Sequence, residues 1–243
     1  MMRSRLLLVF FLMAGFAQGQ AVSTVIVPVV GTAFGPTMIL WKTDVEIANN
    51  TSFPAQVALE LPSIPDGREW FFELGPGERQ RFPDIGTQIF GLENALSPLR
   101  ITSDRSLTVH ASAYAMRGTE ASPAQPIDVY YRDAFAPFRV LDNLAFSDAY
   151  RTNVGLVNFG DRDAEFVLAL QRIPGRDLAV SILTVPSGSF VHTAIQSLFP
   201  MITAGSGFSI VVESSARDTY VYGSVIESTT NAAKFITPRV GTR

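Results

Sequence analysis

The sequence predicts an all-β protein made of two tandem antiparallel β-sandwich domains that are related by internal duplication. The 243 residues include 18 Phe, 15 Pro and 18 Gly, set among short apolar runs that suit strands and tight turns better than long amphipathic helices. One segment of the chain is repeated 109 residues later. Hydrophobic residues make up 47% of the chain and charged residues 17%, which excludes a disordered protein.

The first nineteen residues have the layout of a secretory signal peptide. Arg3 and Arg5 precede an apolar run over 6–13, and small residues lead to a cleavage site expected after Gly19. The apolar run is too short to span a bilayer comfortably, although an uncleaved membrane anchor is the alternative. We therefore expect residues 1–19 to be removed and the mature chain to be secreted, periplasmic or held at the cell surface. Membrane contact is expected only transiently, through the signal peptide.

The duplication is visible when the chain is compared with itself. Residues 42–65 align without a gap on residues 151–174. The identical pairs are Thr43/Thr152, Val45/Val154, Asn49/Asn158, Ala55/Ala164, Leu59/Leu168, Leu61/Leu170, Ile64/Ile173 and Pro65/Pro174. Gly77 also meets Gly188 after a two-residue shift. So many matches in one ungapped segment indicate two copies of one domain.

The domain boundaries follow from the repeat and from local composition. The offset of 109 pairs Pro28 with Pro137, and each of these prolines ends a short extended piece. Residues 117–128 contain Gly, Ser and Pro and few large apolar residues, which is typical of a linker and makes hinge motion the default expectation. The predicted parts are a first β-sandwich over 20–116, a linker and connecting strand over 117–132, and a second β-sandwich over 133–243.

The first strands of each copy are predicted from alternation. Val45 and Ile47 alternate with acidic residues, and apolar residues alternate again over 57–61, which places each apolar set on a buried face. A polar turn cluster at 49–52 lies between the two strands, and its counterpart is 158–161. Two strands joined by such a turn predict an antiparallel hairpin.

Each copy continues with an apolar run, a glycine-containing turn, a short helical or irregular piece and a late strand. In the first copy these elements are 70–72, 74–77, 85–92 and 107–114, and in the second they are 180–183, 185–188, 193–199 and 219–226. Strands at a spacing of roughly ten residues predict a β-sandwich in each copy. A single large barrel is the alternative, but it would not account for the repeat.

Two segments, 41–45 and 150–158, share an aromatic, basic, Thr, Asp or Asn, apolar pattern. This pattern resembles uncharacterised modules of about 100 residues in secreted bacterial proteins. The closing stretch 222–227, followed by 235–238, also resembles the way such modules end. The resemblance implies an Ig-like sandwich on an exported protein and no catalytic residues. Trp41 and Tyr150 share a repeat position and are expected in the two cores.

Residues suited to catalysis or metal binding are few. The chain has no Cys, which excludes disulfides and cysteine-bound zinc. Of the two histidines, His110 is expected to face solvent on a strand, and His192 follows a turn. Alternating carboxylates at 161–165 indicate a solvated turn rather than a calcium loop. We predict no catalytic, cofactor-binding or metal-binding residue, no cofactor, and a protein that is not an enzyme.

Aromatic side chains are the remaining candidates for binding. Tyr220 and Tyr222 lie on one face of a predicted strand and are the candidate contacts with a ligand or partner. Consecutive aromatic residues at 70–72 and 130–131 are further candidates, and the alternative for all of them is packing within the protein.

The predicted function is that of an exported, non-enzymatic structural, adhesive or surface-interaction protein. Its net charge of −3 argues against nucleic-acid binding, which needs clustered Lys and Arg. The expected partner is another envelope or extracellular protein, or a glycan. Two alternatives stay open, a periplasmic pilus-chaperone-like protein and a carbohydrate-binding module. The first is disfavoured because no matching pair of basic residues is apparent in the acidic chain.

Overall fold

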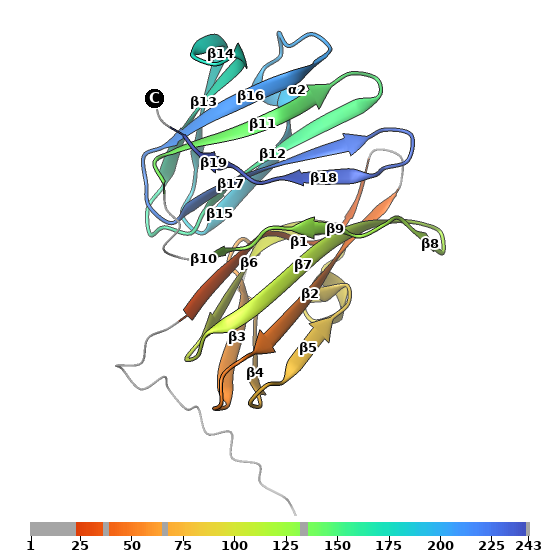
Figure 1. The fold of residues 1–243 in the computed structure, drawn as a ribbon, viewed down its shortest axis with the longest axis vertical. Helices are drawn as coiled ribbons and strands as arrows, with labels where there is room; N and C mark the ends of the chain where they lie inside the picture. The colour runs from red at the N-terminus through yellow and green to blue at the C-terminus, as the bar shows by residue number, and fades with distance from the viewer. Residues whose placement is uncertain (1–22, 36–38, 65–67, 132–135, 242–243) are drawn as a thin grey trace, which may run out of the picture.

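The computed structural model describes residues 23–35, 39–64, 68–131 and 136–241 (Figure 1). These residues form an all-β fold of antiparallel sheets with two short helices, as predicted. The predicted signal peptide, residues 1–19, lies outside the described residues. Within the described ranges, no helix is long and apolar enough to cross a membrane.

The first half of the chain folds around one apolar core. Its elements are β1 (Ser23–Phe34), β2 (Leu40–Asn49), β3 (Ala55–Leu61), β4 (Arg68–Leu74), β5 (Arg79–Phe82), α1 (Ile85–Gln88), β6 (Ala95–Ser103), β7 (Leu107–Arg117), β8 (Glu120–Ala121), β9 (Gln125–Ile127) and β10 (Tyr130–Tyr131). One layer has the order β4-β3-β6-β1-β10, and the other has the order β5-β2-β7, with β8 and β9 beside β7. The end of β1 also pairs with the start of β2, which joins the two layers at one corner.

The second half has two separate sheets around its own core. Its elements are β11 (Phe138–Phe146), β12 (Tyr150–Asn158), β13 (Ala164–Ile173), β14 (Arg176–Val185), β15 (Ser189–Ala194), α2 (Ile195–Leu198), β16 (Gly205–Ser214), β17 (Thr219–Glu227), β18 (Ala233–Ile236) and β19 (Arg239–Val240). The sheet orders are β14-β13-β16-β11-β19 and β15-β12-β17-β18. Each half is therefore consistent with a β-sandwich.

The two halves pair their strands in the same order. The layer β4-β3-β6-β1-β10 corresponds to β14-β13-β16-β11-β19, and β5-β2-β7-β9 corresponds to β15-β12-β17-β18. The short helices α1 and α2 follow β5 and β15, inside the predicted ranges 85–92 and 193–199. Val45 and Ile47 are fully buried in the first core and Val154 in the second, so alternation identified the buried faces.

The predicted hairpin over the turn 49–52 is wrong. β2 pairs with β5 and β7, whereas β3 pairs with β4 and β6, so the chain crosses from one layer to the other at this turn. Asn49 is fully buried at the crossing. Its Nδ2 donates hydrogen bonds to the carbonyl oxygens of Phe53 (2.8 Å) and Leu74 (3.1 Å).

Asn158 holds the equivalent crossing in the second half. Its Nδ2 donates to the carbonyl oxygens of Arg162 (2.8 Å) and Val185 (2.9 Å), and its Oδ1 accepts from the Gly160 N–H (2.9 Å). These bonds satisfy backbone groups that the crossing removes from the sheet ladders. Alternation shows which face of a strand is buried but not which strand is its partner. It therefore could not distinguish a hairpin from this crossing.

The segment 117–132, predicted as a linker and connecting strand, contributes three short strands to the first half. β8 and β9 pair with β7, and β10 pairs with β1 through Ile26 opposite Tyr130. The segment is thus not a free linker as far as Tyr131, after which residues 132–135 lie outside the described residues. A polar, proline-containing composition does not prevent short strands at the edge of a sheet.

The two prolines paired by the repeat do not occupy the same place in the fold. Pro28 lies inside β1, at an irregularity of the ladder between Val27 and Val30, whereas Pro137 precedes β11. Proline is tolerated at a bulge because the bulge already interrupts the ladder of hydrogen bonds. The offset of 109 therefore does not extend to the first strand of each half.

Candidate functional site

Tyr220 and Tyr222, the predicted contact residues, lie in an interface between the two halves. Their side chains are 2% and 0% exposed. Tyr220 packs on Tyr130 of β10 with ring centroids 5.1 Å apart, and Tyr130 Oη donates a hydrogen bond to the Val221 carbonyl oxygen (2.8 Å). Both predicted residues therefore contact other parts of their own chain, in keeping with the alternative of packing within the protein.

The interface is apolar at its centre and polar at its margins. Ile26 of β1 and Val157 of β12 are buried beside the tyrosines. Arg100 of β6 lies over the Phe159 ring, 4.8 Å from its centroid. Figure 1 shows β17 and β18 of the second half facing β1, β9 and β10 of the first. Direct apolar packing of this kind restricts the hinge motion that the linker composition suggested.

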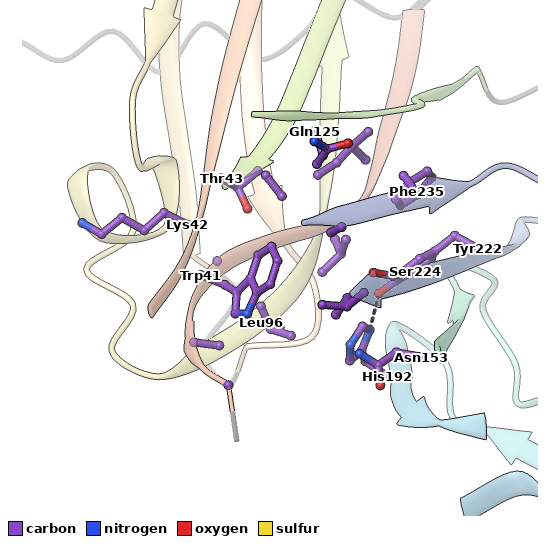
Figure 2. A pocket seen from close by; sticks show the side chains of 18 of the residues that line it. Trp41, Lys42, Thr43, Leu96, Gln125, Asn153, His192, Tyr222, Ser224 and Phe235 are labelled. Atoms are coloured by element: carbon purple, nitrogen blue, oxygen red, sulfur yellow. Dashed lines mark hydrogen bonds between the residues drawn. The ribbon is translucent and has the colours of Figure 1, made fainter. Parts of the chain in front are cut away.

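The ring of Tyr222 lies across β12 because the residue opposite it is a glycine. Gly155 pairs directly with Tyr222, and a Cβ atom at Gly155 would lie 1.9 Å from the ring. The ring stacks on Phe235 of β18 at a centroid distance of 5.2 Å and an interplanar angle of 12°. Its Oη is 2.8 Å from Nδ1 of His192 on β15 (Figure 2). These contacts place Tyr222 in the wall of a cavity.

This cavity has a volume of about 270 Å³ and is lined by both halves. Its walls are largely apolar and include Trp41 and Leu96 from the first half and Tyr222 and Phe235 from the second. Figure 2 shows the indole of Trp41 on one side of the cavity and the pair of His192 and Tyr222 on the other. An apolar hollow between two domains with a few polar groups is a common form of ligand site.

Two cationic side chains border the cavity, and they differ in their partners. Lys42 Nζ is 2.7 Å from Asp84 Oδ2, and Figure 2 shows the Lys42 side chain directed away from the other labelled residues. Arg151 of β12 is half-buried and donates from Nη2 to Asn231 Oδ1 (3.1 Å). Within the described ranges, Arg151 takes part in no ion pair. Burial lowers the pKa of Arg151, which shows that its charge is incompletely solvated.

The histidine in the cavity wall is neutral at pH 7. Burial lowers the pKa of His192 to about 4, and burial raises the pKa of its partner Tyr222. The described residues that line the cavity include no Asp or Glu. Across the part of the chain that the structure describes, no group of three or more His, Cys, Asp or Glu side chains is placed to hold a metal ion. The arrangement is suited to binding a molecule between apolar walls and a single positive charge.

A second surface feature is found on the edge strands. β14 is the end strand of its sheet, and Leu178, Val180 and Ile182 on its outer face are 54%, 55% and 60% exposed. β4 has the corresponding edge position in the first half and exposes Trp70 (45%) and Phe71 (61%). Figure 1 shows the two strands at opposite ends of the molecule.

The first half carries charges on the layer that corresponds to the interface sheet of the second half. Arg79 of β5 contacts Glu46 of β2 (2.9 Å), and Arg81 contacts Asp44 (2.8 Å). His110 of β7 lies opposite Glu46 of β2 and is exposed, as predicted. This face therefore remains in water, whereas its counterpart in the second half is covered.

The expectation that Trp41 and Tyr150 lie in the cores is wrong. Trp41 lines the cavity between the halves, and Tyr150 is 42% exposed. Sequence reasoning also missed Arg151 and His192 as cavity residues. No local pattern indicated them, because the cavity forms only where distant parts of the chain pack together.

The exposed turn at 161–163 agrees with the predicted solvated turn. Within the described ranges, the fold thus brings together Trp41, Arg151, His192 and Tyr222 around one cavity and leaves His110 on a separate surface. The chain matches no protein-family model, no curated protein and no solved structure.

Proposed function

We propose that the protein is an exported, non-enzymatic surface-interaction protein built from two Ig-like β-sandwich modules that arose by duplication. It binds another envelope or extracellular protein by accepting a strand of that partner at the edge of its sheets. The observation that carries this proposal is the row of exposed apolar side chains on β14. The signal-peptide pattern of residues 1–19 supports the export step.

The duplication is supported by contacts that recur at matching positions. Both halves have the same order of strand pairing. Asn49 and Asn158, which are identical in the aligned segment, each bury a side-chain amide at the crossing between layers. Gly77 and Gly188, which match after a two-residue shift, both have positive φ angles of 70° and 65°. A shared use of buried amides and left-handed turns is difficult to explain by a common fold alone.

The chemistry of β14 supports strand addition. An edge strand presents unpaired backbone N–H and C=O groups along one side, and proteins commonly protect such edges with charged residues or proline. In β14, Arg176 and Asp177 stand at the beginning, and residues 178–185 carry no charge and no proline. A partner strand would gain backbone hydrogen bonds along this edge and would pack side chains against the apolar row.

The same feature recurs in the first half, where β4 exposes Trp70 and Phe71 at the corresponding edge. Aromatic side chains provide large contact areas at low entropic cost. Two edges at opposite ends of the molecule would allow one chain to connect two partner molecules. This arrangement supports a structural or adhesive role more than that of a soluble carrier.

The test uses a lysine placed in the apolar row. The chain without residues 1–19 is immobilised and exposed to an envelope extract of the source organism, and retained proteins are quantified by mass spectrometry. We expect one or more proteins to be retained by the wild type and lost with Val180→Lys, because a charged side chain on an edge strand opposes strand pairing. The control is His110→Lys, which adds the same side chain at an exposed position of the other half, on a strand that is paired on both sides.

Hydrogen exchange on the purified complex then locates the contact. The proposal requires slower exchange of the β14 or β4 amides when the partner is bound, because newly formed ladder bonds protect them. Equal retention by the wild type and by the Val180→Lys variant, together with unchanged exchange in both edge strands, would exclude binding at these edges.

A further inference from the structure

We propose that the cavity between the two halves is a binding site for a small apolar monocarboxylate. Its carboxylate contacts Arg151, and its apolar part packs against Trp41 and Phe235. This site lies on a different surface from the edge strands, and the inference does not depend on the function proposed above.

The positive charge of Arg151 indicates that the ligand is negatively charged. A guanidinium that is partly withdrawn from water requires compensation, and Arg151 has only the neutral Asn231 amide oxygen at 3.1 Å as its side-chain partner among the described residues. A carboxylate can accept two parallel N–H donors from one guanidinium. Lys42 is already paired with Asp84, and His192 is neutral, so neither competes for this role.

Two neutral polar groups extend the site beside Arg151. Asn153 lies two residues further along the same face of β12, and Ser224 lies directly opposite Asn153 on β17. Both side chains border the cavity and, within the described part of the chain, make no hydrogen bond to protein. Their amide and hydroxyl groups can therefore donate to the second oxygen of a carboxylate.

The volume and the remaining walls define the rest of the ligand. The cavity of about 270 Å³ lies just below the range of about 300–1,000 Å³ that suits drug-sized molecules, so a smaller ligand of about ten non-hydrogen atoms fits. Trp41, Leu96 and Phe235 provide an apolar wall. A free amine is disfavoured because the lining residues that the structure describes include no Asp or Glu.

The fluorescence of Trp41 provides a direct measurement. The chain has two tryptophans, and Trp70→Phe leaves Trp41 as the only one. In this background, three matched probes are titrated: 3-phenylpropanoate, 3-phenylpropanamide and 3-phenylpropylamine. We expect the carboxylate to bind about tenfold more tightly than the amide, and the amine to bind more weakly than both.

Three variants assign the effect to the cavity. Arg151→Gln removes the preference for the carboxylate over the amide, and Arg162→Gln, at an exposed turn, retains it. Ala113→Phe places a ring in the cavity and abolishes binding of all three probes, with near-ultraviolet circular dichroism showing that the variant is folded.

Each contrary result overturns a defined part of the inference. Equal affinities for the carboxylate and the amide, or an unchanged preference in Arg151→Gln, would overturn the assignment of the anion to Arg151. No fluorescence change with any probe up to millimolar concentrations would overturn the cavity as a small-molecule site. Tighter binding of a pentapeptide with a free C-terminal phenylalanine than of 3-phenylpropanoate would assign the cavity to a polypeptide terminus instead. None of these results affects partner binding by β14, which Val180→Lys tests separately.

Discussion

Replacing the buried asparagine of the second half should cost a large part of that half's stability. In Asn158→Ala, the carbonyl oxygens of Arg162 and Val185 lose their donors and the Gly160 N–H loses its acceptor, three hydrogen bonds of 2.8–2.9 Å. Each such bond contributes about 1 kcal/mol net, and more where a buried group is left without a partner. We therefore expect the free energy of unfolding to fall by about 3 kcal/mol.

This loss can be measured by urea unfolding followed by far-ultraviolet circular dichroism, which reports on the sheets of both halves. With a urea slope of about 2–3 kcal/mol per M, the midpoint of the affected transition moves down by about 1–1.5 M. Asn158→Asp retains the acceptor for Gly160 but loses both donors, so it should be at least as unstable as Asn158→Ala. Asn50→Ala is the control, because Asn50 is exposed and has one side-chain bond, to Thr108 Oγ1 (2.8 Å).

The matching variant Asn49→Ala should destabilise the first half by a similar amount, since Asn49 Nδ2 donates to the carbonyls of Phe53 and Leu74. A loss below about 1 kcal/mol in both Asn49→Ala and Asn158→Ala would refute the reasoning. It would mean that water forms hydrogen bonds with the backbone groups at the crossing when the side-chain amide is removed.

Three further predictions concern the interface between the halves. Because burial lowers the pKa of His192 from 6.5 to about 4, the unfolded chain binds a proton at this side chain more readily than the folded chain does. The contribution of the buried, neutral His192 to stability is therefore complete above pH 6.5 and is lost as the pH falls to 4. Urea unfolding at several pH values should show a loss of about 3 kcal/mol that His192→Gln removes, and identical pH profiles would contradict this assignment. Gly155→Ala should cost about 1–3 kcal/mol by displacing the Tyr222 ring, and the cost should shrink in a Tyr222→Ala background; additive losses would argue against the clash. Tyr130→Phe should lower stability by about 1–2 kcal/mol in the same assay, whereas Tyr131→Phe, at a 48% exposed position, should leave it unchanged; equal effects would refute a role for the buried hydroxyl.

Alternation and turn residues predicted much of the fold because they report on local geometry. Local sequence patterns predicted the positions of α1 and α2 and the burial of Val45 and Val154. These patterns are the alternation of apolar residues and the turn residues, which each extend over only a few positions. The crossing at Asn49 was missed because the partner of a strand depends on distant residues. Which strands pair in a sandwich depends on the topology, and an alternating pattern of apolar residues carries no information about topology.

The candidate site was only partly predictable for a related reason. Tyr220 and Tyr222 were identified as aromatic residues that share one face of a strand, and the structure shows that the other half covers this face. An outer sheet face with aromatic residues indicates a contact, but it does not show whether the contact is with another molecule or with the other half of the chain. Trp41 and Arg151 could be recognised as lining one cavity only when the two halves were packed together, because 110 positions separate them in the chain.

The interface joins two unlike faces, and this asymmetry affects how modules of this kind can be assembled. A head-to-tail contact between similar units is open-ended unless one exposed end differs from the other. In the second half, Gly155 opposes Tyr222 in the covered sheet, whereas in the first half the corresponding pair is Glu46 opposite His110, flanked by Arg81. Since charged side chains such as Glu46 and Arg81 oppose burial, this face of the first half is unsuited to the apolar packing that covers its counterpart. The charged face of the first half and the apolar covered face of the second half are therefore not interchangeable as packing surfaces.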